Sequence, residues 1–356
     1  MSVMAKELDE LLKQTSEWLR GVGPVSDIVM SSRIRLARNL DKQPFATRAT
    51  KASQGEVLTV AKEGIAKSAL LKRPVLFEIS ELNEVDRLFL VERHLVSREH
   101  IVHVDHKAVV IGPGEVVSIM INEEDHLRIQ VIQSGLNLRD AWARIDELDD
   151  ELSTGIPYAY STDWGFLTCC PTNTGTAMRA SVMVHLPALV MSKQINKVLH
   201  TITKLGLTAR GLYGEGTEAS GNFFQISNQV SLGRAESEII ENLERILTQV
   251  IDHEKTAREN LITNNRHQLE DRVGRAFGIL RHAQLMSSTE TLDLLSAVRL
   301  GVDLGMMNGL TRSTVNELFL FSQPAHLQKL EGKNLSSQER DEKRAQLIRK
   351  RLGGAA

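Results

Sequence analysis

Ile28-Val29-Met30-Ser31-Ser32-Arg33-Ile34-Arg35 is the stretch of sequence that decides the fold. Its apolar residues predict a β-strand, and the two-residue period of a strand places Ser31, Arg33 and Arg35 on one face. A single arginine is usually a solvated or paired surface group. Taken alone, Arg33 and Arg35 therefore favour an anion-binding site only modestly, and further evidence has to come from the rest of the sequence.

The composition is that of an ordinary soluble protein, with 42% hydrophobic and 25% charged residues in 356. A net charge of −2 and only 4% aromatic residues give no footprint for direct binding of nucleic acid. We find no leader peptide and no apolar run long enough to span a membrane. Cys169 and Cys170 are adjacent, which excludes a disulfide framework and suits a reducing compartment. We expect a cytoplasmic protein without a membrane anchor.

Apolar periodicity on either side of the first strand predicts an α+β protein, with an antiparallel sheet flanked by helices. Gly112-Pro113-Gly114 lies between two apolar runs and indicates a hairpin. From about residue 235 onward the pattern is helical, with capping boxes at Ser287-x-x-Glu290 and Ser336-x-x-Glu339. We expect three parts: an N-terminal helix at 1–23, an α+β domain at 24–255 and an all-helical domain at 256–356. Further strands are expected near 127–132, 165–169, 178–186, 207–212 and 223–231, and helices near 5–20, 54–71, 81–95, 138–152 and 190–205.

Motifs that hold nucleotide phosphates in a nest of backbone amides are absent from this sequence. It has no GxxxxGK[ST] loop, no dinucleotide-binding glycine turn, and neither the HRD nor the DFG of protein kinases. If the chain uses ATP, side chains have to hold the phosphates. Fixed, planar guanidinium groups suit a transition state whose charge is spread over the phosphoryl oxygens. The candidates are Arg33, Arg35, Arg128, Arg179 and Arg210.

Carboxylates directly follow a predicted strand in Asn122-Glu123-Glu124-Asp125-His126-Leu127-Arg128. Such a run is commonly a polar loop or the start of a helix. The alternative is a catalytic base, since a guanidinium with a pKa above about 12 has to lose a proton before it attacks phosphorus. Glu124, Glu215 and Glu218 are candidates for that base. Cys170 is by default a structural thiol, but a thiolate among arginines could also pair with a guanidinium substrate.

Four segments, in this order, resemble the signatures of the phosphagen kinase family, the ATP:guanido phosphotransferases that include creatine and arginine kinases. Ser31–Arg35 is similar to the family's S-[ST]-R-[VI]-R strand, and Asn122–Arg128 matches its NEEDHxR motif. Cys170–Arg179 follows the CP[ST]NxGTGxR signature at all but one fixed position, and Arg210–Glu215 resembles the RGTxGE loop. The resemblance covers about residues 24–255 and implies that family's catalytic fold.

The resemblance also implies a site for ATP and Mg²⁺. The five arginines are implied to contact the phosphates and His94 to lie near the nucleotide, with Mg²⁺ held mainly by nucleotide and water rather than by protein ligands. Glu124 is implied to be the catalytic carboxylate and Cys170 the thiol that pairs with the guanidinium, while the second carboxylate is either Glu215 or Glu218. The remaining residues implied to line the nucleotide pocket are Ser31, Ser32, Ile34, Ala180, Ser181, Val182, Met183, Gly211, Leu212, Tyr213, Gly214 and Glu215.

Two departures from the metabolic enzymes of this family matter. Those enzymes carry a long helical domain before the first strand, with a loop that closes over a small substrate, whereas here only 30 residues precede Ser31. A helical region of about residues 256–356 follows instead, an arrangement similar to the bacterial protein arginine kinases, whose open site admits an arginine on a protein surface. Within the cysteine signature, Thr174 replaces an apolar residue and Ala177 replaces a glycine. If glycine allows a close backbone approach there, Ala177 is expected to slow turnover or shift the loop.

Arg340-Asp341-Glu342-Lys343-Arg344-Ala345 lies in the last predicted helix. From the residues alone it is interpreted as a solvated helix face. The resemblance to protein arginine kinases offers an allosteric phosphoarginine site instead, in which an aspartate accepts the guanidino N–H groups and an arginine holds the phosphate. The residues so implied are Arg340, Asp341, Arg344 and Ala345, and the C-terminal helices are implied to form a homodimer.

We therefore expect a protein arginine kinase that uses Mg·ATP and acts on proteins with exposed arginines. The resemblance suggests a bacterial stress response with tagging for degradation, and as partners a heat-shock repressor, a zinc-finger activator and a Clp-type ATPase. One alternative is a small-molecule guanidino kinase that acts on free arginine. The other is a non-catalytic adaptor that binds phosphoarginine, for which the altered Thr174 and Ala177 are the only support.

Overall fold

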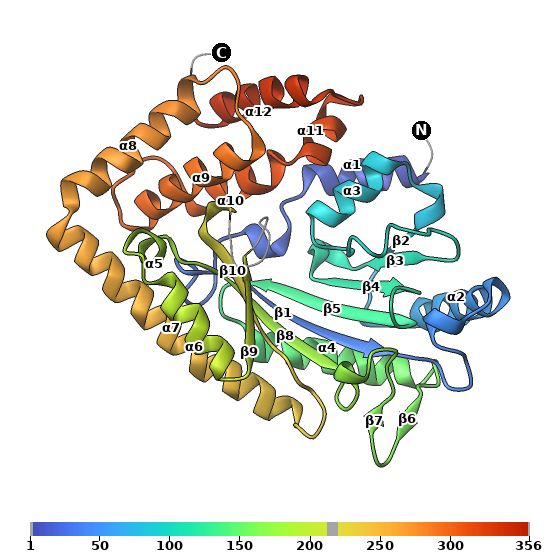
Figure 1. Cartoon of the computed structure of the whole chain (residues 1–356). Helices are drawn as coiled ribbons and strands as arrows, with labels where there is room; N and C mark the ends of the chain where they lie inside the picture. Colours follow the sequence, from blue (N-terminus) through green and yellow to red (C-terminus); the bar gives the residue numbers. More distant parts are fainter. Residues whose placement is uncertain (1–2, 212–219, 355–356) are drawn as a thin grey trace.

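The computed structural model describes residues 3–211 and 220–354 (Figure 1). Its centre is an eight-stranded sheet in which every neighbouring pair of strands is antiparallel, in the order β2-β3-β4-β5-β1-β8-β10-β9. The predicted α+β fold is confirmed. The strands are β1 Val29–Arg38, β2 Val75–Glu78, β3 Ala108–Ile111, β4 Val117–Ile121, β5 Leu127–Ser134, β8 Met178–His185, β9 Leu207–Gly211 and β10 Phe223–Asn228. A separate hairpin consists of β6 Tyr160–Ser161 and β7 Gly165–Phe166.

The stretch Ile28–Arg35 supplies most of the central strand β1, which pairs with β5 on one side and β8 on the other. Ile34 and Leu36 are fully buried, while Arg33 and Arg35 alternate with them on the opposite face. The sheet thus has one apolar face and one face rich in arginine, as the two-residue period predicted.

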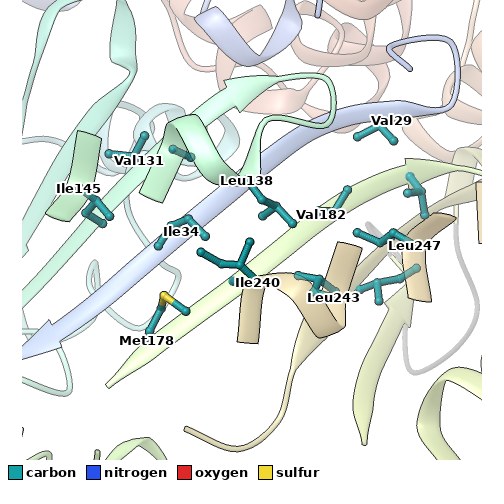
Figure 2. Close-up of a cluster of buried hydrophobic side chains, with 14 of the residues drawn as sticks. Val29, Ile34, Val131, Leu138, Ile145, Met178, Val182, Ile240, Leu243 and Leu247 are labelled. Carbon is teal, nitrogen blue, oxygen red and sulfur yellow. The ribbon is translucent and has the colours of Figure 1, made fainter. Parts of the chain in front are cut away.

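Helices cover the apolar face of the sheet. Side chains from α4 Leu138–Ser153 and α7 Glu236–Asn264 pack against the inward-facing residues of β1, β5 and β8 (Figure 2). Leu138, Ile145, Leu243 and Leu247 from these helices are at most 2% exposed. The helices α2 Lys51–Ala66, α5 Pro187–Met191 and α6 Ile195–Lys204 join the same apolar cluster. By contrast, α1 Val3–Lys13 and α3 Glu84–Glu92 pack in a separate cluster with Val109, Ile111 and Met120.

The C-terminal region is helical and lies against the sheet on the arginine side. A second apolar cluster joins its helices to Met30, Ile132, Met183 and Phe223 of the sheet. Figure 1 shows α7 running from the back of the sheet to these helices. They are α8 Arg266–His282, α9 Ser288–Asp303, α10 Arg312–Phe321, α11 Pro324–Glu331 and α12 Ser337–Arg351.

Capping residues begin several helices where the sequence suggested. The Ser336 hydroxyl accepts the N–H of Glu339, whose carboxylate accepts the N–H of Ser336, which completes the predicted capping box. The Ser287 hydroxyl accepts the N–H of Glu290. These caps set the directions of α12 and α9.

Some predicted bounds were wrong. The first helix ends at Lys13 and a 3-10 turn, Glu17–Leu19, follows. The helix expected at 190–205 is divided into α5 and α6, with Lys193 at a φ of 57° between them. α7 continues through residues 255 and 256, so the domain limits remain predictions. Within the described residues, none of the helices combines the length and apolarity needed to cross a membrane.

Candidate active site

Strand register gathers the five candidate arginines on one face of the sheet. Arg35 lies opposite Arg179 of β8, and Arg128 of β5 lies opposite Ala37. Arg210 of β9 lies opposite Gln225, whose side chain accepts a hydrogen bond from Arg33. Because cross-strand partners project to the same face, all five guanidinium groups share it. A cleft of about 780 Å³ opens over this face and is lined by Arg33, Arg35 and Arg128.

This cluster is electrostatically suited to a polyanion. Burial lowers the pKa of Arg33 to about 10, and repulsion from Arg128 and Arg179 adds to the effect. Burial also lowers the pKa of Arg35 well below its usual value, with the same neighbours contributing. The Nε atoms of Arg35 and Arg179 are buried and find no hydrogen-bond partner among residues 3–211 and 220–354. Ordered water or a ligand usually satisfies buried donors of this kind, and the oxygens of an anion are suitable acceptors for them.

Neighbouring side chains hold the arginines in place. Arg33 donates to Gln225 Oε1 at 3.1 Å, and Arg179 donates to Ser227 Oγ at 3.1 Å. Arg128 forms an ion pair of 2.6 Å with Glu123. Groups locked in this way need little reorganisation when charge develops on a phosphoryl group.

The acidic run forms a tight loop between β4 and β5. Asn122 has a φ of 62°, and its amide donates to the carbonyls of Gln54 and His106. His126 accepts the N–H of Leu40 and donates from Nε2 to a carbonyl. Most of the motif therefore builds the loop itself.

Glu124 is the one carboxylate that this loop leaves exposed. Glu123 is used by Arg128 and by Ser97 Oγ, whereas the Glu124 carboxylate accepts no hydrogen bond from the part of the chain that is described. Partial burial raises the pKa of Glu124, and the charges of Asp125 and Glu123 raise it further. A carboxylate with a raised pKa at the rim of a cationic cleft is suited to proton transfer.

Asp125 ties this loop to the cysteine segment. Its Oδ1 accepts hydrogen bonds of 2.7 Å from both Asn39 Nδ2 and the backbone N–H of Cys169. The half-buried Cys170 follows at once, with Sγ 3.0 Å from Thr172 Oγ1. Glu124 precedes Asp125 and Cys170 follows Cys169. The hydrogen bond between Asp125 and Cys169 therefore connects the segments of Glu124 and Cys170, which are far apart in sequence.

The structure divides the other predicted pocket residues between the two faces of the sheet. Ser31, Ser181 and Met183 share the arginine face, since they pair across β1 and β8 with one another or with Arg33. Ile34, Ala180 and Val182 point into the apolar core instead. Ser32 also turns away from the cleft: its hydroxyl donates to the carbonyl of Gly135 and accepts the N–H of Asn137.

His94 lines the cleft as the resemblance implied. Its ring meets the edge of Trp18 at a centroid distance of 4.9 Å, and its carbonyl accepts a 2.6 Å hydrogen bond from Gln130. Burial, aided by the charge of Arg33, lowers the pKa of His94 to about 3. The imidazole is therefore neutral at physiological pH, which suits a place beside the nucleoside rather than a phosphate.

The glycine loop lies largely outside the described residues. Arg210, which is exposed, and Gly211 end β9. Leu212, Tyr213, Gly214, Glu215 and Glu218 fall in the stretch 212–219, which is not described. The choice between the two glutamates as second carboxylate remains a prediction.

Sequence reasoning missed the cleft wall supplied by the C-terminal helices. Ser288, Thr289 and Leu292 from the start of α9, together with Gln323 and Pro324 at the start of α11, line the same cleft as the arginines. The capping box marked the start of α9, but nothing in the sequence showed which surface that start would face. Gln225 was also missed, although the two-residue period of its predicted strand could have placed it.

The C-terminal motif is partly internal. The Arg344 side chain is 1% exposed and donates to the carbonyls of Ser322 and Met286 and to Asp341. Ala345 is buried in the helical core, whereas Arg340 and Asp341 are half-buried. The interpretation as a solvated face was wrong for Arg344.

The two departures in the cysteine signature have local structural correlates. Thr174 Oγ1 lies 3.1 Å from Thr168 Oγ1 and so joins the hydroxyl network that holds the Cys170 carbonyl. Ala177 has a φ of 52°, a left-handed backbone that favours glycine. The alanine is accommodated at the cost of local strain.

Comparison with known proteins identifies the family. The model of the ATP:guanido phosphotransferase C-terminal catalytic domain matches residues 59–257, and that of the protein-arginine kinase McsB C-terminal domain matches residues 266–356. A protein-arginine kinase of Halothermothrix orenii is 50% identical over 344 residues, which are 97% of this chain and 98% of that protein. One of Symbiobacterium thermophilum is 50% identical over 340 residues, 95% of this chain and 96% of that protein.

Solved structures with this fold include two other guanidino kinases. A duplicated taurocyamine kinase of Schistosoma mansoni superposes with a TM-score of 0.60 at 27% identity, over 66% of this chain and 34% of that one. A lombricine kinase superposes with a TM-score of 0.58 at 24% identity, over 70% of this chain and 75% of that one, and shows the fold alone. With the sequence relatives, these place the chain firmly: it belongs to the ATP:guanido phosphotransferase family, among the protein-arginine kinases.

Proposed function

We propose that this chain transfers the γ-phosphate of ATP to a guanidino nitrogen of arginine residues in proteins. The observation that carries the proposal is the Asp125 link, which places the neighbours of Glu124 and Cys170 together at the rim of the arginine face. A nucleotide held by the arginines would direct its γ-phosphate toward that rim. Base, thiol and phosphate then surround one position for the acceptor.

The reaction needs in-line displacement at phosphorus. A guanidino nitrogen of the substrate attacks, the new P–N bond forms as the bond to the ADP oxygen breaks, and Glu124 takes the proton that the nitrogen loses. Arg128 and Arg179 stabilise the charge spread over the transferring oxygens. Because the product P–N bond is labile to acid, the mark suits regulation.

Cys170 orients the acceptor in this proposal. Its sulfur pairs with the part of the guanidinium that does not react, so that the attacking nitrogen points at the phosphate. Either Glu215 or Glu218 supplies the second carboxylate. When bound with ATP, Mg²⁺ supplies positive charge at the phosphates. The family resemblance implies that nucleotide and water, rather than protein ligands, would mainly hold the ion.

The wider setting follows from the family resemblance. We propose a cytoplasmic enzyme of the bacterial stress response that acts with a heat-shock repressor, a zinc-finger activator and a Clp-type ATPase. The C-terminal helices form its homodimer contact. Arg340 and Asp341, half-buried on α12, bind phosphoarginine as an allosteric site, while Arg344 and Ala345 hold that surface to the helical core.

Phosphoryl transfer from γ-labelled ATP tests the proposal. Wild type is expected to label an arginine-rich protein with an acid-labile phosphate, and Glu124→Gln to lose that label. Glu241→Gln, an exposed glutamate of α7, is the matched control and keeps it. Label on free arginine but not on protein would favour a small-molecule kinase. ATP binding without any label would favour an adaptor.

A further inference from the structure

The β6–β7 hairpin projects from the body of the protein beside the ends of β1 and β8 (Figure 1). Tyr160 and Trp164 on this hairpin are each 59% exposed. Tyrosine and tryptophan are enriched at surfaces that contact a partner. Neither the arginine cluster nor Glu124 accounts for them.

The base of the hairpin belongs to the catalytic rim. Phe166 forms an isolated bridge with Gly175, so the segment that contains Cys170 is the loop closed by this bridge. The Leu167 carbonyl accepts a 3.0 Å hydrogen bond from Asn39, the residue that also donates to Asp125. A chain bound on the hairpin would therefore lie in a fixed relation to Glu124 and Cys170.

The hairpin already holds a guanidinium group. The Arg38 guanidinium lies 3.5 Å from the centroid of the Phe166 ring. Tyr160 lies opposite Phe166 in the hairpin and shares its face, and the two rings meet edge to face at a centroid distance of 5.2 Å. Among the described residues no arginine or lysine lies over the ring of Tyr160 or Trp164. Aromatic faces attract arginine by cation–π contact and stacking.

Charge favours a cationic occupant as well. Between Leu152 and Arg179 the chain has one charged residue, Asp163, at the tip of the hairpin, and no lysine or arginine. Protein segments rich in arginine carry the opposite charge.

We propose that Tyr160 and Trp164 form a docking surface for the substrate polypeptide next to its target arginine. This inference rests on the proposed function and extends it, because it makes the flanking chain a determinant of which arginines react. The aromatic pair binds flanking backbone and basic side chains, while the target guanidinium enters the rim between Glu124 and Cys170.

Kinetics with two tryptophan-free peptides test the docking role. One has about 20 residues around a central arginine and can extend about 60 Å. The other is a tripeptide around the same arginine, which is too short to contact the hairpin while its arginine lies at the rim between Glu124 and Cys170. Trp164→Ala and Tyr160→Ala are expected to raise KM for the long peptide about five- to thirtyfold and to leave kcat unchanged. KM for the tripeptide stays as in wild type. Leu205→Ala, 42% exposed at the end of α6, is the control and changes neither constant.

Tryptophan fluorescence tests docking without turnover. Trp18 is buried and Trp142 half-buried, so acrylamide reaches Trp164 most readily. The long peptide is expected to protect Trp164 from quenching, and the tripeptide is not. Unchanged KM for the long peptide, or an equal rise for both peptides, would overturn the inference. If protection of Trp164 from quenching increases with enzyme concentration in the absence of peptide, the hairpin is instead a contact between two copies of this chain. If wild type phosphorylates neither peptide but the long one still protects Trp164, the proposed function fails and the docking surface stands.

Discussion

Replacing Asp125 by alanine removes a carboxylate that is 3% exposed and accepts two hydrogen bonds of 2.7 Å. Hydrogen bonds to charged groups contribute about 1.5–3 kcal/mol each. Asn39 keeps a second acceptor in the Leu167 carbonyl, whereas the N–H of Cys169 loses the acceptor that Asp125 supplies. We therefore expect the free energy of unfolding to fall by about 2–4 kcal/mol.

The effect on turnover is expected to be larger than a loss of stability explains. Without the link, the Glu124 loop and the Cys170 segment move independently, and a misplacement of about 1 Å costs about a hundredfold in kcat. Asp125→Asn keeps an oxygen acceptor and should recover most of this loss. Because the charge of Asp125 helps to raise the pKa of Glu124, the asparagine variant should also reach full activity at lower pH.

Steady-state phosphorylation and urea unfolding of both variants, at a temperature where each is folded, provide the test. We expect a large kcat defect in Asp125→Ala with little change in KM for ATP, since the arginine face is intact. A kcat within twofold of wild type would refute the positioning role. An asparagine variant as slow as the alanine variant would show that charge, not geometry, matters.

Three further predictions concern the same site. Because the pKa of Glu124 is raised, kcat/KM should be lost as pH falls through a pKa above that of an ordinary glutamate. Glu99→Gln removes a like charge near Glu124 and should move this acid limb of the pH profile to lower pH. An acid limb that does not move would contradict the assignment of Glu124 as the base. Ala177→Gly should leave the free energy of unfolding in urea nearly unchanged, because relief of left-handed strain, about 1–2 kcal/mol, offsets the lost methyl group. The control Ala180→Gly, in an extended core strand, lacks that relief and should lower the free energy of unfolding by about 1.5 kcal/mol. Equal losses in the two variants would show that no strain exists at Ala177. Arg35→Met replaces a buried cation, repelled by its neighbours, with an apolar side chain, and should therefore raise the free energy of unfolding of the ligand-free protein by about 1–2 kcal/mol. The same variant should bind ATP at least tenfold more weakly in calorimetry. Tighter ATP binding would contradict the phosphate role of Arg35.

The sequence pattern predicted the features that depend only on the two-residue period of a strand. The two-residue period of β1 placed Arg33 and Arg35 together and, by the same rule, turned Ile34 toward the core; the family resemblance alone did not separate them. The acidic motif offered Glu124 as a candidate base, but the role of Asp125 depends on Asn39 and Cys169, which only the tertiary fold brings near. The helical pattern expected from about residue 235 corresponds to α7, whose apolar residues continue past the domain limit predicted near residue 255.

The burial of Arg344 shows the same limit of local reasoning. Its segment is the most hydrophilic of the helices, and a pattern of charges spaced along a helix indicates a solvated face. The carbonyls of Ser322 and Met286, at the ends of other segments, provide its acceptors. No periodicity within α12 could reveal partners supplied by the turns around it.

The cleft wall built by α9 and α11 has a consequence for inhibitor selectivity. Leu292 and Pro324 line the cleft over the arginine face but belong to the helical region, which lies beyond the residues that match the family's catalytic domain. A compound that competes with ATP through the arginines alone would meet much the same chemistry in any guanidino kinase. One that extends past His94 to these two apolar side chains would contact a surface that the shared catalytic domain does not supply, and so would distinguish protein-directed enzymes from their metabolic relatives.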